Sequence, residues 1–535
     1  MPRKKQKKQA AQTADDRVSQ LPIHILHHIL CSLSQREAVR TCLLSKQWRY
    51  IGSTRPNLEF SFGNTQEKFV SVVDQTLQGY CDQNLSIHKL HLDLSSPDSR
   101  PVISLLDKWI PMKPALNIKV FKLDLLSYTQ DLPPAVFLAE ALEELHLCKC
   151  RVSPVVESVR LKSLRTLSLE QVQVDGGTLE TVMLGCPLLT RLLLNYCWEL
   201  RNVRLRSSGL KHLELCDSNR IKGCSIEIDV PNLETVFING PWIWRQSTFA
   251  FSGLTSLYLC DVILSSESFD LLSSGCSTLA RLALDNCSGF EEFHLASDSV
   301  KFLRIWTTEV LLKGVRICAP NIVSFQFIAR ISQAPDTFSF TTTNSKEWSS
   351  KVFFSSHEDD PDLDLNSWLL KLRRVLKAVS GSRISLFLQM EVGLQGVPCN
   401  AAIADEPPVV VQTLKFGTCK CRTADWYMVF MNGLFRVCRP SYLWGCRLMN
   451  KSDGNYGLSE FQLNILLAKR KVRTTTDQKR KKVRTKPYFW RHDLEQVSVG
   501  TLDGQQWQLI RWKKLGVLQK RTQDKKTCFI LKWRS

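Results

Sequence analysis

Two hydrophobic patterns divide the chain. Between residues 21 and 49 the apolar positions lie three or four residues apart, which is the spacing of amphipathic helices. Pro22 suits the first turn of a helix, where its missing N–H costs no intrahelical hydrogen bond. Helices this short cannot bury their apolar faces alone, so the segment is predicted to need a partner surface. Its two apolar series are Ile25, Leu26, Ile29, Leu30 and Leu33, then Ala38, Val39, Cys42, Leu43 and Leu44.

The second pattern, apolar-x-x-apolar-x-apolar, recurs along the middle of the chain. From Leu142 onward its copies begin 21 to 25 residues apart, a period typical of leucine-rich repeats. Each copy predicts a short strand whose x positions face outward, and neighbouring copies must stack to bury the apolar residues. The copies begin at Ile87, Ile118, Leu142, Leu164, Leu189, Leu210, Leu233, Leu254, Leu279, Val300 and Ile322.

Further helices and strands flank these copies. Helical periodicity predicts helices over 65–81, 364–379, 423–437 and 458–468. Beyond the last copy we expect strands at Ile384–Leu388, at VQTLKF from Val411 and at LEQVSV from Leu494, and a final capping strand in TCFILKWRS.

Composition narrows the class of protein. The chain of 535 residues is 44% hydrophobic and 23% charged, which is typical of a folded protein with several domains or one repeat array. No apolar run approaches the length of a membrane span, and the basic N-terminus lacks the apolar stretch of a secretory signal. We therefore expect a cytosolic or nuclear protein without a membrane partner.

The net charge of +20 is concentrated in two tracts. Residues 1–8 carry five basic side chains, and residues 469–486 carry ten against one aspartate, which leaves only +6 for the rest. Three interpretations of the tracts stay open: a nuclear import signal, non-specific binding to nucleic acid, or a solvated loop without a role. The candidate import residues are Lys469, Arg470, Lys471, Lys479, Arg480, Lys481 and Lys482.

The nineteen cysteines do not show the spacing of a zinc site, because no C-x-x-C pair occurs. Cys150, Cys197 and Cys287 each stand three residues after the last apolar position of a repeat copy. There a small polar side chain can turn inward toward loop backbone. These thiols, together with Cys186, Cys276 and Cys318, are predicted to be packed and not to act as nucleophiles or ligands.

The segment from Leu21 to Trp48 resembles the F-box, a module that docks onto the Skp-family adaptor of cullin ubiquitin ligases, and its Leu-Leu-Ser-Lys-x-Trp-Arg ending resembles the plant form. Many relatives have an acidic residue where this chain has Ile23-His24. The resemblance implies a set of adaptor-binding residues: Leu21, Pro22, Ile25, Leu26, Ile29, Leu33, Val39, Leu43, Leu44, Ser45 and Trp48.

The resulting fold class is α/β, with a short helical F-box followed by a leucine-rich-repeat solenoid that carries parallel strands on one face and helices or loops on the other. We interpret 364–535 as degenerate repeats with a disordered basic insertion at 469–486; an F-box-associated FBD-type ending is the alternative. The expected divisions are a basic tail at 1–16, the F-box at 17–60, a connecting helix at 61–84, repeats at 85–330 and a linker at 331–363.

Catalytic and metal chemistry find little support in the sequence. His24, His27 and His28 have helical spacing but lack a third ligand, and the acidic residues from His357 to Asp364 lack the glycine and terminal glutamate of a calcium loop. We therefore predict no enzyme activity, no metal and no cofactor.

The predicted function is that of an adaptor linking a protein substrate, bound by the repeats, to a Skp–cullin ubiquitin ligase for ubiquitination and degradation. The alternatives are a nuclear, nucleic-acid-associated repeat protein and a scaffold independent of any ligase. The sequence favours the nucleus, then the cytoplasm. Candidate substrate-binding residues at outward strand positions are Glu144, His146, Arg165, Arg191, His212, Tyr258 and Arg281.

Overall fold

The computed structural model comprises two compact units, Met1–Leu233 and Glu234–Ser535, and each is described by itself. No helix among the described residues has the length and hydropathy needed to span a membrane. The structure describes residues 21–33, 35–62, 66–94, 100–110, 116–126, 130–153, 159–217, 224–244, 251, 253–266, 277–343, 348–356, 364–390, 406–419, 424–444, 490, 493–503, 506–510 and 527–534.

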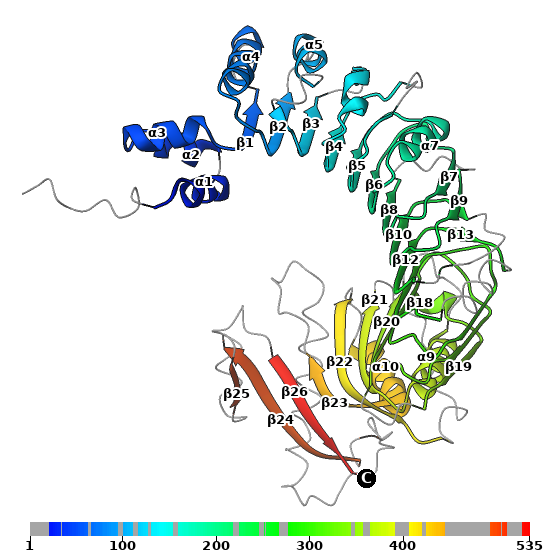
Figure 1. The fold of residues 1–535 in the computed structure, drawn as a ribbon. Helices are drawn as coiled ribbons and strands as arrows, with labels where there is room; N and C mark the ends of the chain where they lie inside the picture. The colour runs from blue at the N-terminus through cyan, green and yellow to red at the C-terminus, as the bar shows by residue number, and fades with distance from the viewer. Residues whose placement is uncertain are drawn as a thin grey trace, which may run out of the picture. The chain divides into compact units, whose positions relative to one another are not determined.

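The N-terminal segment folds into three short helices in the first unit, as the helical spacing predicted (Figure 1). Pro22 lies at the N-cap of the first, where its carbonyl accepts hydrogen bonds from Ile25 and Leu26. The helices are α1 (Ile23–Ser32), α2 (Gln35–Thr41) and α3 (Lys46–Ser53).

A strand and a long helix join these helices to the repeats. Strand β1 (Asn57–Ser61) pairs in parallel with β2 (Lys89–Leu94), and α4 (Gln66–Asp82) between them confirms the helix predicted over 65–81. The hydroxyl of Tyr80 in α4 donates to the carbonyl of Arg55 at 2.7 Å. This buried contact fastens the end of the F-box segment to the first repeat.

All six copies of the repeat pattern in the first unit form strands of one parallel sheet, which confirms that prediction. Inward leucines alternate with outward x positions along each strand. The helices that follow β1 in this unit lie on one side of these strands (Figure 1). The strands are β2, β3 (Val120–Leu125), β4 (Glu144–Cys148), β5 (Thr166–Glu170), β6 (Arg191–Asn195) and β8 (His212–Cys216); the helices are α4, α5 (Arg100–Trp109), the 3-10 helix η1 (Pro134–Leu138) and α7 (Gly176–Leu184).

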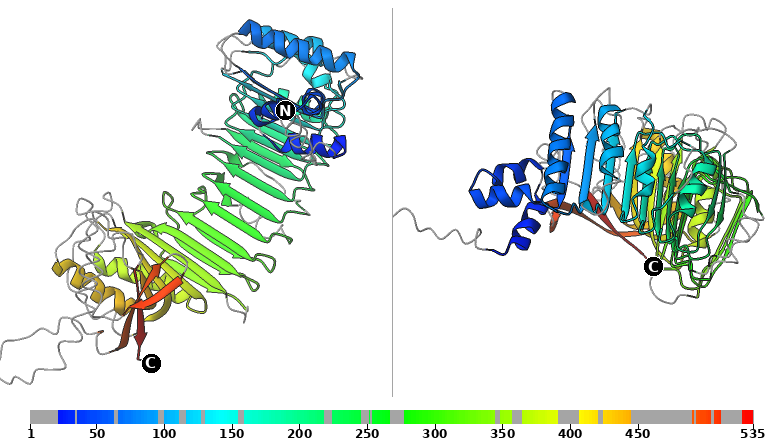
Figure 2. Two further views of the ribbon diagram at one scale, coloured as in Figure 1. Left: turned by 90° about the vertical axis from the view of Figure 1, so that its left-hand side faces the viewer. Right: turned by 45° about the horizontal axis from the view of Figure 1, so that its top comes forward.

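The remaining five copies form strands of a parallel sheet in the second unit, where further strands extend it (Figure 2). The copies give β10 (Thr235–Asn239), β12 (Ser256–Cys260), β14 (Arg281–Asp285), β16 (Phe302–Thr307) and β18 (Ser324–Arg330). The extension is β20 (Ser349–Ser356), β21 (Arg383–Met390), β22 (Val409–Cys419) and β23 (Cys438–Trp444).

A left-handed residue ends several of these strands. Each has a φ between 49° and 58°, and its N–H donates to a carbonyl of the next strand, as Lys149 does to Glu170 at 3.0 Å. Four residues after the end of β14, Gly289 has a φ of 95°, and a Cβ there would clash with the carbonyl oxygen of Leu264. The other such residues are Gln171, Tyr196, Asp261 and Asn286.

The expectation of helices or loops on the second face is wrong for several repeats, which have a second short strand there. Val203 and Leu205 are buried two residues apart, and this alternation favours extended backbone over a helix. In the first unit β7 (Asn202–Arg206) pairs with β9 (Ser225–Asp229). In the second, β11 (Ile243–Trp244) pairs with β13 (Ile263–Leu264), and β15 (Glu292–Ala296), β17 (Gly314–Cys318) and β19 (Thr337–Thr341) pair in that order.

The linker predicted over 331–363 is also wrong, because β19 and β20 lie within it and both pair with repeat strands. The apolar residues of β20, Val352 to Phe354, are consecutive and do not have the spacing of the repeat pattern, so the pattern did not predict this strand. A short 3-10 helix, η2 (Ile331–Gln333), connects β18 to β19.

The predicted helices over 364–379 and 423–437 are confirmed as α9 (Leu365–Ala378) and α10 (Ala424–Val437). They pack through the rings of Trp368 and Phe430, whose centroids are 5.7 Å apart. Asp364 caps α9 by accepting a hydrogen bond from the N–H of Ser367 at 2.8 Å. The helix predicted over 458–468 lies outside the described residues.

The C-terminal strands depart from repeat geometry. Strand β26 (Thr527–Trp533) pairs antiparallel with both β23 and β24 (Leu494–Asp503), and β24 pairs antiparallel with β25 (Gln506–Ile510). The predicted final strand therefore exists and covers the edge of β23, but these strands form an antiparallel ending and not degenerate parallel repeats.

Candidate functional site

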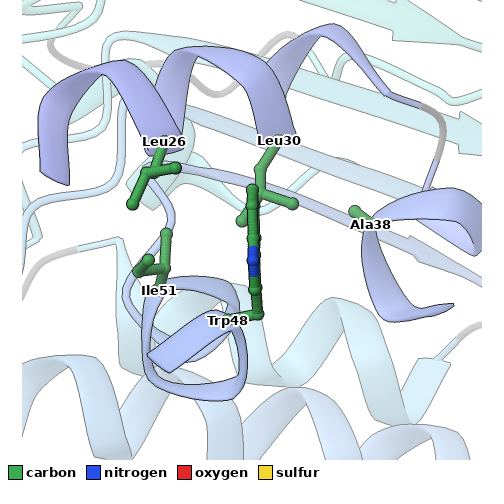
Figure 3. Packing of buried hydrophobic residues seen from close by; sticks show 5 residues of the cluster. All are labelled: Leu26, Leu30, Ala38, Trp48 and Ile51. Atoms are coloured by element: carbon green, nitrogen blue, oxygen red, sulfur yellow. The ribbon is translucent and has the colours of Figure 1, made fainter. Parts of the chain in front are cut away.

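The three F-box helices share a small hydrophobic core (Figure 3). The indole of Trp48 from α3 lies between side chains of α1 and α2, and Ile29 and Leu33 pack against the cluster from its edge. Because five side chains make most of this core, each carries a large share of its packing energy. The cluster is Leu26, Leu30, Ala38, Trp48 and Ile51.

Ser45 positions the tryptophan. Its hydroxyl caps α3 by accepting a hydrogen bond from the N–H of Trp48 at 3.2 Å. An N-cap of this kind stabilises a helix by about 1 kcal/mol. The serine of the Leu-Leu-Ser sequence therefore stabilises helix α3.

The structure divides the predicted adaptor-binding residues into two groups. Leu26 and Trp48 are buried, Ile29 and Leu33 are partly buried against the same core, and Ser45 is a helix cap, so these five side chains hold the module together and their part in adaptor binding stays a prediction. The others are exposed, with Leu43 at 76% and Leu44 at 71%. We call the exposed apolar members the F-box surface set: Leu21, Ile25, Val39, Leu43 and Leu44, with Pro22 exposed beside them.

Two further apolar side chains of this segment are exposed and were missed by the sequence reasoning. Ile23 is 49% exposed and Tyr50 is 58% exposed. Helical spacing gave no signal for either residue, because Ile23 stands three residues before the buried Leu26 and Tyr50 is next to the buried Ile51. We add both residues to the F-box surface set.

The outward residues of the first unit form rows across its strands, because the parallel register aligns equivalent positions. One row places Glu59, His91, Lys122 and His146 on consecutive strands. His91 makes contacts with two carboxylates, at 2.7 Å to Asp124 and 3.4 Å to Glu59. Two neighbouring carboxylates therefore compensate the positive charge that His91 carries when protonated.

The pKa values of the two histidines in this row are shifted in opposite directions. The hydrogen bond that His91 donates to the Asp124 carboxylate raises the pKa of His91, whereas burial lowers the pKa of His146 despite Glu144 at 3.2 Å. His91 in turn lowers the pKa of the Asp124 carboxyl. His91 therefore carries positive charge at a higher pH than His146 does.

The predicted substrate-binding residues all lie at outward positions and are exposed or half-buried, but they fall in two units. Two neighbours at x positions of the same pattern, Ser256 and Ala283, are buried. In the first unit the set comprises Glu144, His146, Arg165, Arg191 and His212, and in the second Tyr258 and Arg281.

The second unit carries an outward row that sequence reasoning missed. Aromatic, aliphatic and basic side chains follow one another on adjacent strands β16 to β23, paired in register. The alternation of apolar and polar residues along each strand indicates which side chains point outward. The sequence does not show which of these side chains align across neighbouring strands, because that depends on the pairing register. We call this the aromatic row: Trp306, Ile328, Phe353, Phe387, Lys415 and Trp444.

The repeat cysteines lie where the pattern predicted. The thiol of Cys197 donates to the carbonyl of Leu169 at 3.5 Å, and that of Cys287 to the carbonyl of Leu259 at 3.4 Å. Burial raises the pKa of Cys150 and of Cys197 to about 12. Such thiols stay protonated and are poor nucleophiles or ligands.

Packed thiols were also predicted at Cys186, Cys318 and Cys276. Cys186 is buried, but Cys318 is exposed at the end of β17, so predicting a packed thiol there was wrong. Cys276 lies outside the described residues.

The histidines, acidic residues and basic tracts singled out in the sequence do not form a further site among the described residues. Across the described ranges no group of three His, Cys, Asp or Glu side chains could hold a metal ion, and His27 contacts the hydroxyl of Thr54 at 3.1 Å. The acidic residues from His357 to Asp362 and both basic tracts, including Lys469–Lys471 and Lys479–Lys482, lie outside the described residues.

Comparisons with known proteins agree with this architecture. The F-box domain profile matches residues 18–59, and a profile described as "FBD-associated F-box protein At5g56370, LRR repeats" matches 106–248 and 241–333. Neither profile extends into the part of the chain that contains the antiparallel ending.

Curated relatives come from Arabidopsis thaliana. The F-box/FBD/LRR-repeat protein At1g13570 is 34% identical over 34% of this chain and 44% of its own length. The F-box/LRR-repeat protein 13 is 30% identical over 41% of this chain and 51% of its own length. The chain thus spans about half the length of the curated relatives it matches.

The fold and the profile matches agree on the class of protein: an F-box is followed by an array of leucine-rich repeats. The chain belongs to the plant F-box/leucine-rich-repeat proteins, which confirms the resemblance stated from its sequence. Members of this family are typically non-catalytic adaptors.

Replacing Trp48 tests the F-box core. Trp48→Ala should destabilise the three helices by about 3–5 kcal/mol, because it leaves a large cavity in a five-residue core. Hydrogen exchange measured by mass spectrometry should show faster exchange in peptides spanning 23–53 and little change in the repeats. Leu43→Ala is the matched control and should change exchange little, since Leu43 is 76% exposed. Equal protection in the Trp48 variant and in the wild type would contradict the assignment.

Replacing Asp124 tests the cause of the His91 shift. Asp124→Asn should lower the pKa of His91 clearly, because the hydrogen bond to the carboxylate is the largest influence raising it. NMR of histidine labelled at Cε1 measures the titration. Glu59→Gln should lower the same pKa less, since Glu59 acts only through its charge. An unchanged His91 titration in Asp124→Asn would show that the carboxylate is not the cause.

Proposed function

We propose that this chain is the substrate-recognition subunit of a Skp–cullin–F-box ubiquitin ligase. Its F-box would bind a Skp-family adaptor and through it a cullin, while the repeats bind a protein substrate for ubiquitination and proteasomal degradation. The observation that supports the proposal is the F-box surface set. A three-helix module with a five-residue core leaves seven apolar side chains exposed, and such exposure is typical of a surface that a partner covers.

The chain would contribute position and no covalent chemistry. Bringing a substrate lysine close to the charged conjugating enzyme raises the rate by proximity, which a rigid repeat array can supply. The alternative of a thioester on a cysteine of this chain finds no support in the buried repeat thiols, because burial raises the pKa of Cys150, Cys186 and Cys197 to about 12.

The adaptor contact is tested at its two most exposed residues. Leu43→Ala with Leu44→Ala should weaken binding of a Skp-family adaptor by about tenfold or more, since each leucine would lose an apolar contact made in the complex. Copurification of coexpressed adaptor, followed by titration of the purified proteins, measures this.

A matched control lies in the repeats. Leu184 at the end of α7 is 82% exposed, so Leu184→Ala removes a leucine of similar exposure outside the F-box and should leave adaptor binding unchanged. Adaptor recovered with the double variant as well as with the wild type would refute the proposed docking surface.

Nuclear localisation is part of the proposal and relies on the basic tract at 469–486, which lies outside the described residues. Replacing Lys479, Arg480, Lys481 and Lys482 together by alanine should shift a fluorescent fusion from the nucleus to the cytoplasm, because import receptors recognise the clustered positive charge.

Conservative replacement provides the control for import. Exchanging lysine for arginine and arginine for lysine at these four positions keeps the charge and should keep the nuclear fraction. A fusion whose distribution is the same in all three forms would show that the tract has no role in import.

A further inference from the structure

The strand face of the second unit combines half-buried rings with an excess of basic over acidic side chains. Outward positions of β14 to β22 hold six basic side chains against a single carboxylate, Asp285, which Arg304 already contacts at 2.9 Å. The basic residues are Arg281, Arg304, Arg330, Lys351, Arg383 and Lys415.

The basic groups lie beside the rings of the same face. The guanidinium of Arg304 is 5.1 Å from the centroid of the Trp306 ring, and the ammonium of Lys415 is 4.8 Å from that of Trp444. Arg281 similarly lies 5.3 Å from the ring of Phe302, which is 41% exposed. Cations in these positions are held near the sheet by the rings while their charge remains directed at the outward side.

The orientation of the central rings distinguishes between anionic partners. Phe353 and Phe387, on adjacent strands, stack with centroids 4.8 Å apart and an interplanar angle of 11°. Rings stacked on each other across strands turn their faces to one another and their edges outward. Ring edges carry partial positive charge and attract carboxylate oxygens, whereas nucleobases need free ring faces for stacking.

We propose that this face binds an acidic protein segment that carries aromatic or aliphatic side chains between its carboxylates. The proposal deepens the proposed function, since it names the chemical class of substrate that the repeats would present. The aromatic row crosses six strands, or about 24 Å at the usual strand spacing, which matches about seven residues of extended peptide.

The first unit offers a contrast that supports this choice of face. There His91 and Lys119 contact carboxylates within 2.7 Å, so a binding anion would have to compete with existing pairs. At the outward positions of strands β14 to β22, which the structure describes, Asp285 is the one carboxylate that competes. Charge complementarity therefore favours an acidic segment at the second unit.

A defined peptide tests the proposal. The full-length chain, purified with a Skp-family adaptor, is titrated with a fluorescein-labelled peptide of about twelve residues in which Asp or Glu alternates with Phe or Leu. Fluorescence anisotropy should show saturable binding that weakens steeply with salt, because exposed cations contribute to it. A peptide with lysine in place of each acidic residue should bind at least about tenfold more weakly, and so should a single-stranded oligothymidine.

Variants locate the site. Lys351→Glu with Lys415→Glu should weaken the acidic peptide by about tenfold or more, since both side chains are exposed on this face. Arg316→Glu is the matched control: it reverses an exposed strand cation of the same unit, in β17 of the three-stranded sheet, and should change affinity less than about twofold.

Each outcome decides the proposal. No saturable binding, equal binding of the lysine peptide, tighter binding of the oligothymidine, or an equal loss in the Arg316 variant would overturn it. Adaptor content is measured in the same preparations. Loss of peptide binding with adaptor retained therefore refutes only the substrate class, whereas absent adaptor with peptide still bound refutes only the ligase role.

Discussion

The structure depends on one constraint: a repeat of about 22 residues cannot bury its own leucines. Each strand of β2 to β8 presents two or three apolar side chains on one side, and only the neighbouring repeats can cover them. Parallel pairing in register satisfies this requirement, since it stacks leucine on leucine from strand to strand. The same register aligns the outward positions, so the surface rows are a by-product of the way the core is built.

This constraint explains which parts of the fold could be predicted. Eleven copies of the pattern became strands because each copy contains its own inward and outward positions. The second strands, such as β7 with Val203 and Leu205, carry only two apolar residues and no fixed spacing, which is too little to distinguish a strand from a loop. The antiparallel ending was missed for another reason: the direction of pairing of β26 depends on β23, a strand about ninety residues earlier.

The F-box shows the limit of apolar patterning for a binding site. Leu26 and Leu43 are both leucines of one motif, yet one lies in the core and the other is 76% exposed. Helical phase could separate inner from outer positions within α1, but Leu43 and Leu44 lie between α2 and α3, where no helical phase applies. Only the packing of Trp48 against α1 and α2 decides which side chains remain outside.

The two strand faces differ because of charge pairing more than charge content. A carboxylate that approaches His91 or Lys119 must displace Asp124 or Glu143, and the free energy of the broken pair offsets most of the new one. Lys351 and Lys415 stand on strands β14 to β22, where the one carboxylate at an outward position already contacts Arg304, so the proposed acidic segment would displace water instead of that anion. The stacked Phe353 and Phe387 lower the exposure of that face to solvent without adding charge, which strengthens an ion pair formed beside them. Under the proposal, discrimination between partners follows from this pairing: carboxylates already contact His91 and Lys119 in the first unit, whereas the outward positions of β14 to β22 hold Asp285 as their one acidic side chain.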